Sequence, residues 1–424
     1  MNLEEPRVKP ERLSRADAAR WHMGTPTNPM VIGALLLFDR RLTLEAIEAL
    51  VRDKLVPHRR FRQHVVESRH RFGAPRWLDD APFDLYEHVR RLNPSGPVDA
   101  GALSDLVAER INAPLPLERS PWTFEVVDLL PLGSALLVRI HHCIADGRAL
   151  VAVLEELADE GLGADHGRPQ IRLSPEPTRR PRFFGQLAGL LRLFTRSGDP
   201  VSLLRRPLNG RKCVAWSEAI PLDTIKAIAA GHGGHVADVL LAGVAGALDR
   251  YARDHGEVPR SVHALLPVAA PSKALAGELG NHYASVFVSL PAAIDDPQVR
   301  LATIARDMTV LRSGGQSRLA GSLVRVAGSV APGIERRALR WGARRASLVV
   351  SSLAGPRTPL RIAGQPLGAI VIWAPAAATI GLSVTLFGYA GEIRLGVLTD
   401  SAVIDRPQQL VVAFQAAIDE LRRG

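Results

Sequence analysis

The chain has 424 residues, 46% of them hydrophobic and 23% charged, which predicts more than one domain and excludes overall disorder. Its formal charge of +10 suits an anionic partner, but aromatic residues make up only 5% and no zinc-finger or RNP-type pattern occurs, so nucleic acid is not expected. The charged N-terminus lacks the apolar core of a secretory signal, no apolar run approaches the roughly 18 residues of a membrane span, and two cysteines suit a reducing cytosol.

Helix-like and strand-like segments alternate along the first half of the chain. Residues 30–39 form a continuous apolar run, as in a buried strand, and residues 42–55 carry apolar side chains at helical spacing. The same reasoning predicts a helix at 101–115, strands at 122–130 and 134–142 joined by a tight turn, and a helix at 148–163. This order is typical of an α/β domain.

Composition changes between about residues 163 and 212, where Pro, Gly and Arg predict a connector. From Thr178 to Lys212 nine Arg and Lys residues stand against one acid, Asp199, and residues 183–194 are predicted to form a short helix with basic flanks. A second basic segment, from Arg312 to Arg345, has eight arginines and one acid.

The alternation then resumes in the second half. The predicted elements are a segment at 217–231, a helix at 235–256, strands at 261–270 and 284–291, a helix at 297–312, strands at 369–375, 382–391 and 392–400, and a helix at 406–423. We therefore predict two α/β domains of similar architecture, at residues 1–177 and 213–424, linked by a basic crossover at 178–212.

Two adjacent histidines, His141 and His142, close the strand predicted at 134–142. Because side chains alternate along a strand, the two imidazoles are expected on opposite faces, so they do not make a paired metal site, and no third ligand is clustered near them. A neutral histidine with a pKa of about 6.5 can take a proton from a hydroxyl group. The alternative interpretation is a core histidine with its polar atoms satisfied.

The residues that follow have structural interpretations. Asp146 either caps the helix predicted to begin at Arg148 or pairs with an arginine and holds the loop, while Gly147 permits a positive φ or a close backbone approach. Cys143 is expected to pack as a small apolar residue rather than to act as a nucleophile. The chain contains no G-x-S-x-G elbow, H-E-x-x-H, P-loop or dinucleotide fingerprint that would offer a competing site.

The HHxxxDG pattern at residues 141–147 and its surroundings resemble the bacterial wax ester synthase/acyl-CoA:diacylglycerol acyltransferases (WS/DGAT), within the HHxxxDG superfamily of CoA-dependent acyltransferases. The resemblance runs in order through about residues 11–423. Its blocks are residues 13–39, 75–92, 118–130, 206–229, 235–251, 265–270, 279–291, 294–301, 351–364 and 381–400.

This resemblance implies two chloramphenicol-acetyltransferase-like domains, each a mixed sheet flanked by helices, with the active-site channel between them. It implies His142 as the general base, Asp146 as an orienting residue paired with an arginine, and a supporting role for His141. The implied substrates are a fatty acyl-CoA and either diacylglycerol or a long-chain alcohol, and the products are triacylglycerol or a wax ester and CoA, with no cofactor.

Acyl transfer also needs a hydrogen-bond donor for the developing oxyanion, and the candidates are Ser383, Thr385 and Asn281. The chain departs from the family pattern at several polar positions while keeping the base. The departures are Gly24, Val31, Thr123, Ala237, Ser352, Ala354 and Ser383. We expect them to affect acceptor choice and turnover.

Three functions are therefore considered. The first is an acyl-CoA-dependent O-acyltransferase acting on a lipid hydroxyl. The second is a condensation-type or polyketide-associated acyltransferase with a carrier-bound donor, and the third is a weakly active relative that binds lipid. Basic segments would contact CoA phosphates or an anionic membrane or lipid-droplet surface, which predicts a cytoplasmic protein that attaches peripherally to the inner membrane or to droplets. The alternative for residues 178–212 is a solvated crossover.

Overall fold

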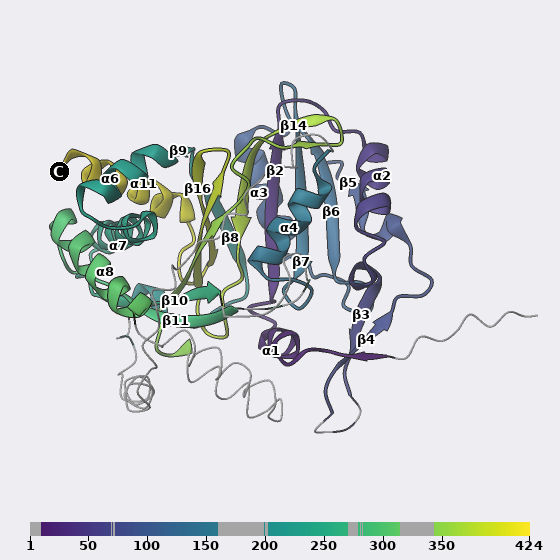
Figure 1. Cartoon of the computed structure of the whole chain (residues 1–424), viewed down its shortest axis with the longest axis horizontal. Helices are drawn as coiled ribbons and strands as arrows, with labels where there is room; N and C mark the ends of the chain where they lie inside the picture. The colour runs from purple at the N-terminus through teal and green to yellow at the C-terminus, as the bar shows by residue number, and fades with distance from the viewer. Residues whose placement is uncertain are drawn as a thin grey trace, which may run out of the picture.

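The computed structural model describes residues 10–68, 70, 73–159, 199, 202–269, 279, 281, 283–313 and 343–424. Two large sheets dominate these residues and lie side by side, one carrying the early strands and the other most of the late ones (Figure 1). Helices flank both sheets. The predicted α/β fold class is therefore confirmed.

The first sheet has six strands in the spatial order β13–β14–β2–β7–β6–β5. Only β5 is parallel to its neighbour, and the other pairs are antiparallel. The strands are β2 (Val31–Phe38), β5 (Val89–Arg91), β6 (Trp122–Asp128), β7 (Ser134–His141), β13 (Arg361–Ile362) and β14 (Gln365–Trp373). Because β13 and β14 come from the C-terminal half of the chain, this sheet is built from both halves.

Helices cover the two faces of this sheet with different partners. On one face α2 (Leu44–Lys54) and α4 (Gly147–Leu157) bury side chains such as Ile47 and Val153 against the strands. On the other face α3 (Ala100–Asn112) packs Leu103 and Val107 against the first sheet together with residues of the second. Near the N-terminus lie helix α1 (Arg15–Met23) and a small sheet of β1 (Glu11–Arg12), β4 (Arg76–Asp79) and β3 (Gln63–Val66).

The second sheet has the order β11–β10–β12–β15–β16–β8, and β9 also pairs with β16. Strand β12 runs parallel to both β10 and β15, whereas the remaining pairs are antiparallel. The strands are β8 (Lys212–Trp216), β9 (Ile220–Pro221), β10 (Val262–Ala269), β11 (Tyr283–Leu290), β12 (Leu348–Ala354), β15 (Leu382–Tyr389) and β16 (Glu392–Asp400).

A layer of helices covers the outer face of the second sheet (Figure 1). The longest, α7, is buried along most of its length and packs against α11, because its sequence is apolar on nearly every side. The helices are α6 (Leu222–Gly231), α7 (Val236–Asp254), α8 (Pro297–Ser313) and α11 (Pro407–Arg423). No single helix among the described residues is long and apolar enough to cross a membrane, although α6 and α7 meet that criterion together as a pair bent by 96°.

The two sheets meet along β14. A Cβ on Gly396 of β16 would lie 2.3 Å from the carbonyl oxygen of Ile372, so only glycine fits at this crossing. Beside it, the Trp373 indole N–H donates to the Ala215 carbonyl oxygen (3.2 Å), and the Trp373 and Trp216 rings pack edge to face. The junction between the sheets is therefore a tightly packed seam.

The helices and strands predicted within the described residues are present, with ends that shift by a few residues. Helix α1, strands β8 and β12 and several strands of two to four residues were not predicted, nor was the position of β14 in the first sheet. The short helix predicted at 183–194, most of the crossover at 178–212 and most of the basic segment from Arg312 to Arg345 lie outside the described residues. The domain boundaries therefore stay a prediction.

Candidate active site at the histidine loop

The two histidines lie where the central strand of the first sheet gives way to a helix. Strand β7 ends at His141, one residue earlier than predicted, so His142 begins the turn that leads to α4 at Gly147. Both histidines are buried, with exposed fractions of 4% and 7%. Strand alternation therefore fixes the side-chain direction of His141 only, because the side chain of His142 is directed by the turn.

The backbone of His142 is held on both sides by groups outside the motif. Its N–H donates to the Met30 carbonyl oxygen (2.7 Å), just before β2. Its carbonyl oxygen accepts from the Nδ2 of Asn281 (2.8 Å), which also donates to Oδ1 of Asp17 on α1 (2.9 Å). Both Nδ2 hydrogens of Asn281 are thus engaged, which favours a role in holding the loop over the predicted role of oxyanion donor.

Burial keeps both imidazoles neutral at pH 7. Burial and the nearby positive charge of Arg20 lower the pKa of His142 from 6.5 to about 4, with Asp146 acting in the opposite direction. Burial, and then His142, lower the pKa of His141 to about 3. A neutral imidazole has a lone pair to accept a proton, so His142 has the protonation state that a general base requires.

His141 and Cys143 make structural contacts. The Cys143 backbone N–H donates to Nδ1 of His141 (3.2 Å), which places the ring proton on Nε2, and the Trp21 ring lies 5.1 Å from the imidazole between centroids. Burial and the nearby Asp17 carboxylate raise the pKa of the fully buried Cys143 thiol well above its usual value. Cys143 therefore packs as a small apolar residue, as expected, because a thiol in this state is a poor nucleophile.

Asp146 and Gly147 fix the start of the following helix. Asp146 Oδ1 accepts hydrogen bonds from the backbone N–H groups of Arg148 and Ala149 (3.0 Å each), so the helix-cap interpretation of Asp146 is confirmed. A Cβ on Gly147 would lie 2.8 Å from Cδ1 of Leu353 on β12, so Gly147 allows the close approach that sequence reasoning proposed. The contact also brings the second sheet directly against the histidine loop.

The two hydroxyl candidates lie on strand β15 and differ in their bonding. Leu382, Val384 and Leu386 belong to the core under the helices of the second sheet, so the alternate side chains of Ser383 and Thr385 face away from those helices. Thr385 Oγ1 accepts a hydrogen bond from the Ala374 N–H (3.0 Å). The Oγ of Ser383, also buried, has no hydrogen-bond partner among the residues that the structure describes.

Several of the departures from the family pattern lie near this loop or on the strand beside it. Val31 pairs with His141 across β2 and β7, and Thr123 is buried on β6. Gly24 caps the C-terminal end of α1, and Ala237 lies in the first turn of α7. Ser352 and Ala354 lie on β12.

Sequence reasoning missed the part that α1 plays in this site. Its buried face carries the polar residues Asp17, Arg20 and His22 beside two alanines, so it shows no apolar stripe to predict a helix. Asp17 and Arg20 both act on the motif, through Asn281 and through the pKa of His142. A run of charged residues after the N-cap Ser14 was the available signal.

No group of three or more His, Cys, Asp or Glu side chains that could hold a metal ion occurs among the described residues. The described residues provide a buried neutral histidine on a helix-capped loop, and two buried hydroxyl side chains on β15, the strand paired with β12. Two mixed sheets that meet at such a loop are the arrangement that the resemblance to CoA-dependent acyltransferases implies.

Comparison with known proteins assigns the family. The model of the wax ester synthase/diacylglycerol acyltransferase catalytic domain matches residues 13–219, and the model of the WS/DGAT C-terminal domain matches residues 279–422. The chain therefore belongs to the wax ester synthase/diacylglycerol acyltransferase family and is an acyltransferase. The resemblance inferred from the motif blocks is confirmed.

Individual relatives agree with this assignment. A Mycobacterium tuberculosis protein named a probable diacylglycerol O-acyltransferase is 25% identical over 422 residues, which span 92% of this chain and 91% of that protein. The solved wax ester synthase/diacylglycerol acyltransferase from Marinobacter aquaeolei VT8 matches with a TM-score of 0.70 at 20% identity, over 97% of this chain and 98% of that one. The first condensation domain of the calcium-dependent antibiotic synthetase matches with a TM-score of 0.67 at 18% identity, over 98% and 96%, which shows a shared fold alone.

Proposed function

We propose that this chain transfers a fatty acyl group from acyl-CoA to the hydroxyl group of a lipid acceptor, with His142 as the general base. The observation that carries the proposal is the state of His142, which is buried, neutral at pH 7 because its pKa is lowered to about 4, and fixed through both backbone polar groups. Membership of the family and the names of its relatives support the reaction class.

The proton movements balance over one transfer. The neutral imidazole of His142 takes the proton of the acceptor hydroxyl as its oxygen attacks the thioester carbonyl carbon. The new C–O bond forms, the C–S bond breaks, and the imidazolium gives its proton to the leaving CoA thiolate. Because burial makes the imidazolium unfavourable, the second proton transfer is favoured and the base is regenerated in its neutral form.

Ser383 is the candidate donor to the oxyanion in this scheme. Its hydroxyl is buried and has no hydrogen-bond partner among the described residues, whereas the Thr385 oxygen is held by the Ala374 N–H and both Nδ2 hydrogens of Asn281 are engaged. A hydroxyl donor aimed at the negative oxygen of the tetrahedral intermediate lowers the barrier most where water is excluded. Asp146 and Gly147 hold the loop and take no part in the proton transfer.

Diacylglycerol and long-chain alcohols are the proposed acceptors, which would give triacylglycerol and wax esters. Such acceptors reside in membranes or lipid droplets, and a chain with a formal charge of +10 is suited to approach an anionic lipid surface. Acyl-CoA is a substrate and the reaction as written needs no cofactor. We propose that the protein works peripherally at such a surface.

A panel of donors and acceptors tests this proposal. Purified protein is supplied with palmitoyl-CoA or with the same acyl group on an acyl-carrier protein, and each donor is combined with diacylglycerol, hexadecanol or an amine acceptor. We expect CoA release and ester formation with the CoA donor and a lipid hydroxyl. Ester or amide formation only from the carrier-bound donor would contradict the proposal and favour the condensation-type reaction.

A further inference from the structure

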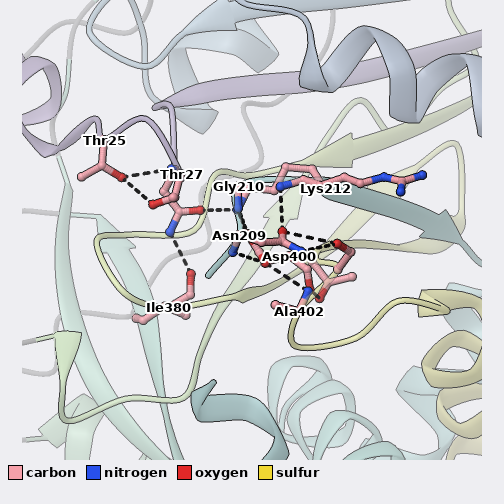
Figure 2. Close-up of polar contacts among 12 residues, drawn as sticks. Thr25, Thr27, Asn209, Gly210, Lys212, Ile380, Asp400 and Ala402 are labelled. Carbon is pink, nitrogen blue, oxygen red and sulfur yellow. Dashed lines mark hydrogen bonds and ion pairs between the residues drawn. The ribbon is translucent and has the colours of Figure 1, made fainter. Parts of the chain in front are cut away.

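A buried network of polar side chains joins the N-terminal and C-terminal halves of the chain (Figure 2). Its charged members are Lys212, at the start of β8, and Asp400, at the end of β16, and both are at least nine-tenths buried. Lys212 Nζ lies 3.3 Å from Oδ2 of Asp400 and donates a shorter hydrogen bond to Oδ1 of Asn28 (2.6 Å). Asn28 belongs to the loop between α1 and β2, so this pair crosses from one half of the chain to the other.

The carboxylate of Asp400 is fixed by backbone groups as well. Its oxygens accept hydrogen bonds from the N–H groups of Asn209 (3.1 Å), Gly210 (2.9 Å) and Ala402 (3.1 Å) (Figure 2). Burial lowers the pKa of Lys212, and the Asp400 carboxylate acts in the opposite direction. The position of the Lys212 ammonium is thus set by groups of the C-terminal half.

Asn28 also holds the segment before β15, the strand that carries Ser383, through hydrogen bonds. Its Nδ2 donates to the carbonyl oxygens of Ala378 (2.8 Å) and Ile380 (2.9 Å), in the segment that leads into β15. Ala378 has a φ of 49°, a left-handed conformation that costs a residue with a Cβ and needs support from its surroundings. Ser383 follows Ile380 by three residues, so the amide of Asn28 holds the start of its strand.

The same loop also holds the base. Met30 follows Asn28 by two residues, and its carbonyl oxygen accepts the hydrogen bond from the His142 N–H (2.7 Å). Asn28 is therefore connected to His142 through one short stretch of backbone and to Ser383 through another. Displacing Asn28 would shift the two groups relative to each other.

We propose that the contact between Lys212 and Asn28 sets the distance between His142, the base, and the hydroxyl of Ser383. Lys212 and Asn28 are then positioning residues for acyl transfer. This inference rests on the proposed function, in which His142 and Ser383 act on the same substrate. A buried ion pair is a costly way to gain stability, because apolar side chains in place of both partners often serve as well, although removal of one partner alone is destabilising. A buried charge is well suited to fixing the relative positions of the groups around it, because its hydrogen-bond partners must lie at defined places.

Three variants test the inference. Lys212→Met removes the charge and keeps most of the volume, whereas Lys212→Arg keeps the charge. Asn28→Asp keeps an oxygen for Lys212 but loses both donors to the carbonyl groups of Ala378 and Ile380. We expect Lys212→Met and Asn28→Asp to lower kcat by about 10- to 100-fold with the KM values for acyl-CoA and alcohol within about threefold, because misplaced reacting groups cost rate rather than binding. Lys212→Arg should recover part of the loss.

Arg300→Met is the matched control. Arg300 on α8 is another buried cation paired with a buried carboxylate, that of Asp249, but it lies in the helical layer and contacts neither the Asn28 loop nor the start of β15. It should lower the Tm as Lys212→Met does and leave kcat within about twofold at a temperature where both variants are folded. This comparison separates positioning from stability.

The outcomes are distinct. If Lys212→Met and Asn28→Asp keep the kcat of the control, or if only KM rises, the inference is wrong. If Lys212→Met does not fold, Asn28→Asp alone decides between the same two results. A His142→Ala variant assayed in parallel separates this failure from that of the proposed function, which fails if His142→Ala retains full activity whatever the other variants do.

Discussion

The two sheets present their chemical groups in different ways. The first carries His142 just beyond the end of β7, where its N–H bonds to Met30, directly before β2, and its carbonyl oxygen accepts from Asn281 of a distant segment. The second carries Ser383 and Thr385 inside β15, with β12 and β16 paired on either side. The hydroxyl groups are therefore positioned by strand register, while the base is positioned by long-range contacts.

This difference suggests where each half is sensitive to change. A residue inside a paired strand moves only if the ladder shifts, so its neighbours tolerate substitution as long as pairing is kept. A residue in a turn depends on each of its contacts, and for His142 these include the Met30 carbonyl oxygen and the Asn281 amide. Apart from Asn28, which contacts the segments before both groups, substitutions far away in sequence should affect the base more than the hydroxyls.

The largest effect is expected at the base. His142→Ala should lower kcat by roughly 100- to 10,000-fold, the range for loss of a general base, with little change in KM. His141→Ala should cost much less activity and more stability, because His141 packs under Trp21 and accepts the Cys143 N–H. Ester formation and thermal unfolding measure the two effects, and equal losses of activity in both variants would contradict the division of roles.

The next largest effect on kcat is expected on β15, at Ser383. Ser383→Ala should lower kcat by roughly 100- to 1,000-fold, as removal of an oxyanion donor does. Thr385→Val leaves the half-buried Ala374 N–H without its acceptor, so it should lower the free energy of unfolding by about 1–2 kcal/mol and change kcat less. If Thr385→Val proves the more damaging to kcat, the oxyanion role belongs to Thr385 instead.

Acid should destabilise the folded protein through the two buried histidines, His141 and His142. The pKa of His142 is about 4 and that of His141 about 3 in the folded protein, against 6.5 for the ordinary group, so the unfolded chain binds more protons between these values. The free energy of unfolding should be at its full value above pH 6.5 and fall as pH decreases toward 4, by at most about 1.4 kcal/mol per pH unit for each histidine. Denaturant unfolding of wild type and His142→Gln over this range checks the slope, which should be shallower in the variant. Above pH 5 the rate should show no titration of His142.

The smallest effect concerns the contact between the sheets at the loop. Gly147→Ala places a methyl group against Leu353, and overpacking of this kind costs about 1–3 kcal/mol. Leu353→Ala in the same chain should recover part of the loss, because it vacates that space. Thermal unfolding of the single and double variants gives the coupling, and additive losses would show that the contact is not the cause.

Local sequence patterns predicted most elements of this fold and the core of its site. Period-two and period-3.6 patterns identified β7 and α4, and a helix cap by Asp146 was one of the two interpretations of the loop between them. Helix α1 was missed because it buries polar side chains such as Asp17 and Arg20, which give no apolar period. The contact of Asn281 with His142 spans 139 positions in the chain and that of Lys212 with Asn28 spans 184, and no local pattern reports pairs so distant.

The placement of β14 has a consequence for biosynthesis. Strand β2 lies between β7 and β14, so one of its edges has no partner until the ribosome has delivered residues 365–373. Until then the nascent N-terminal half exposes an apolar strand edge, the kind of surface that recruits other chains. The C-terminal half thus completes its partner's sheet during translation, and a gene cut between the halves would yield two fragments that each lack part of a core.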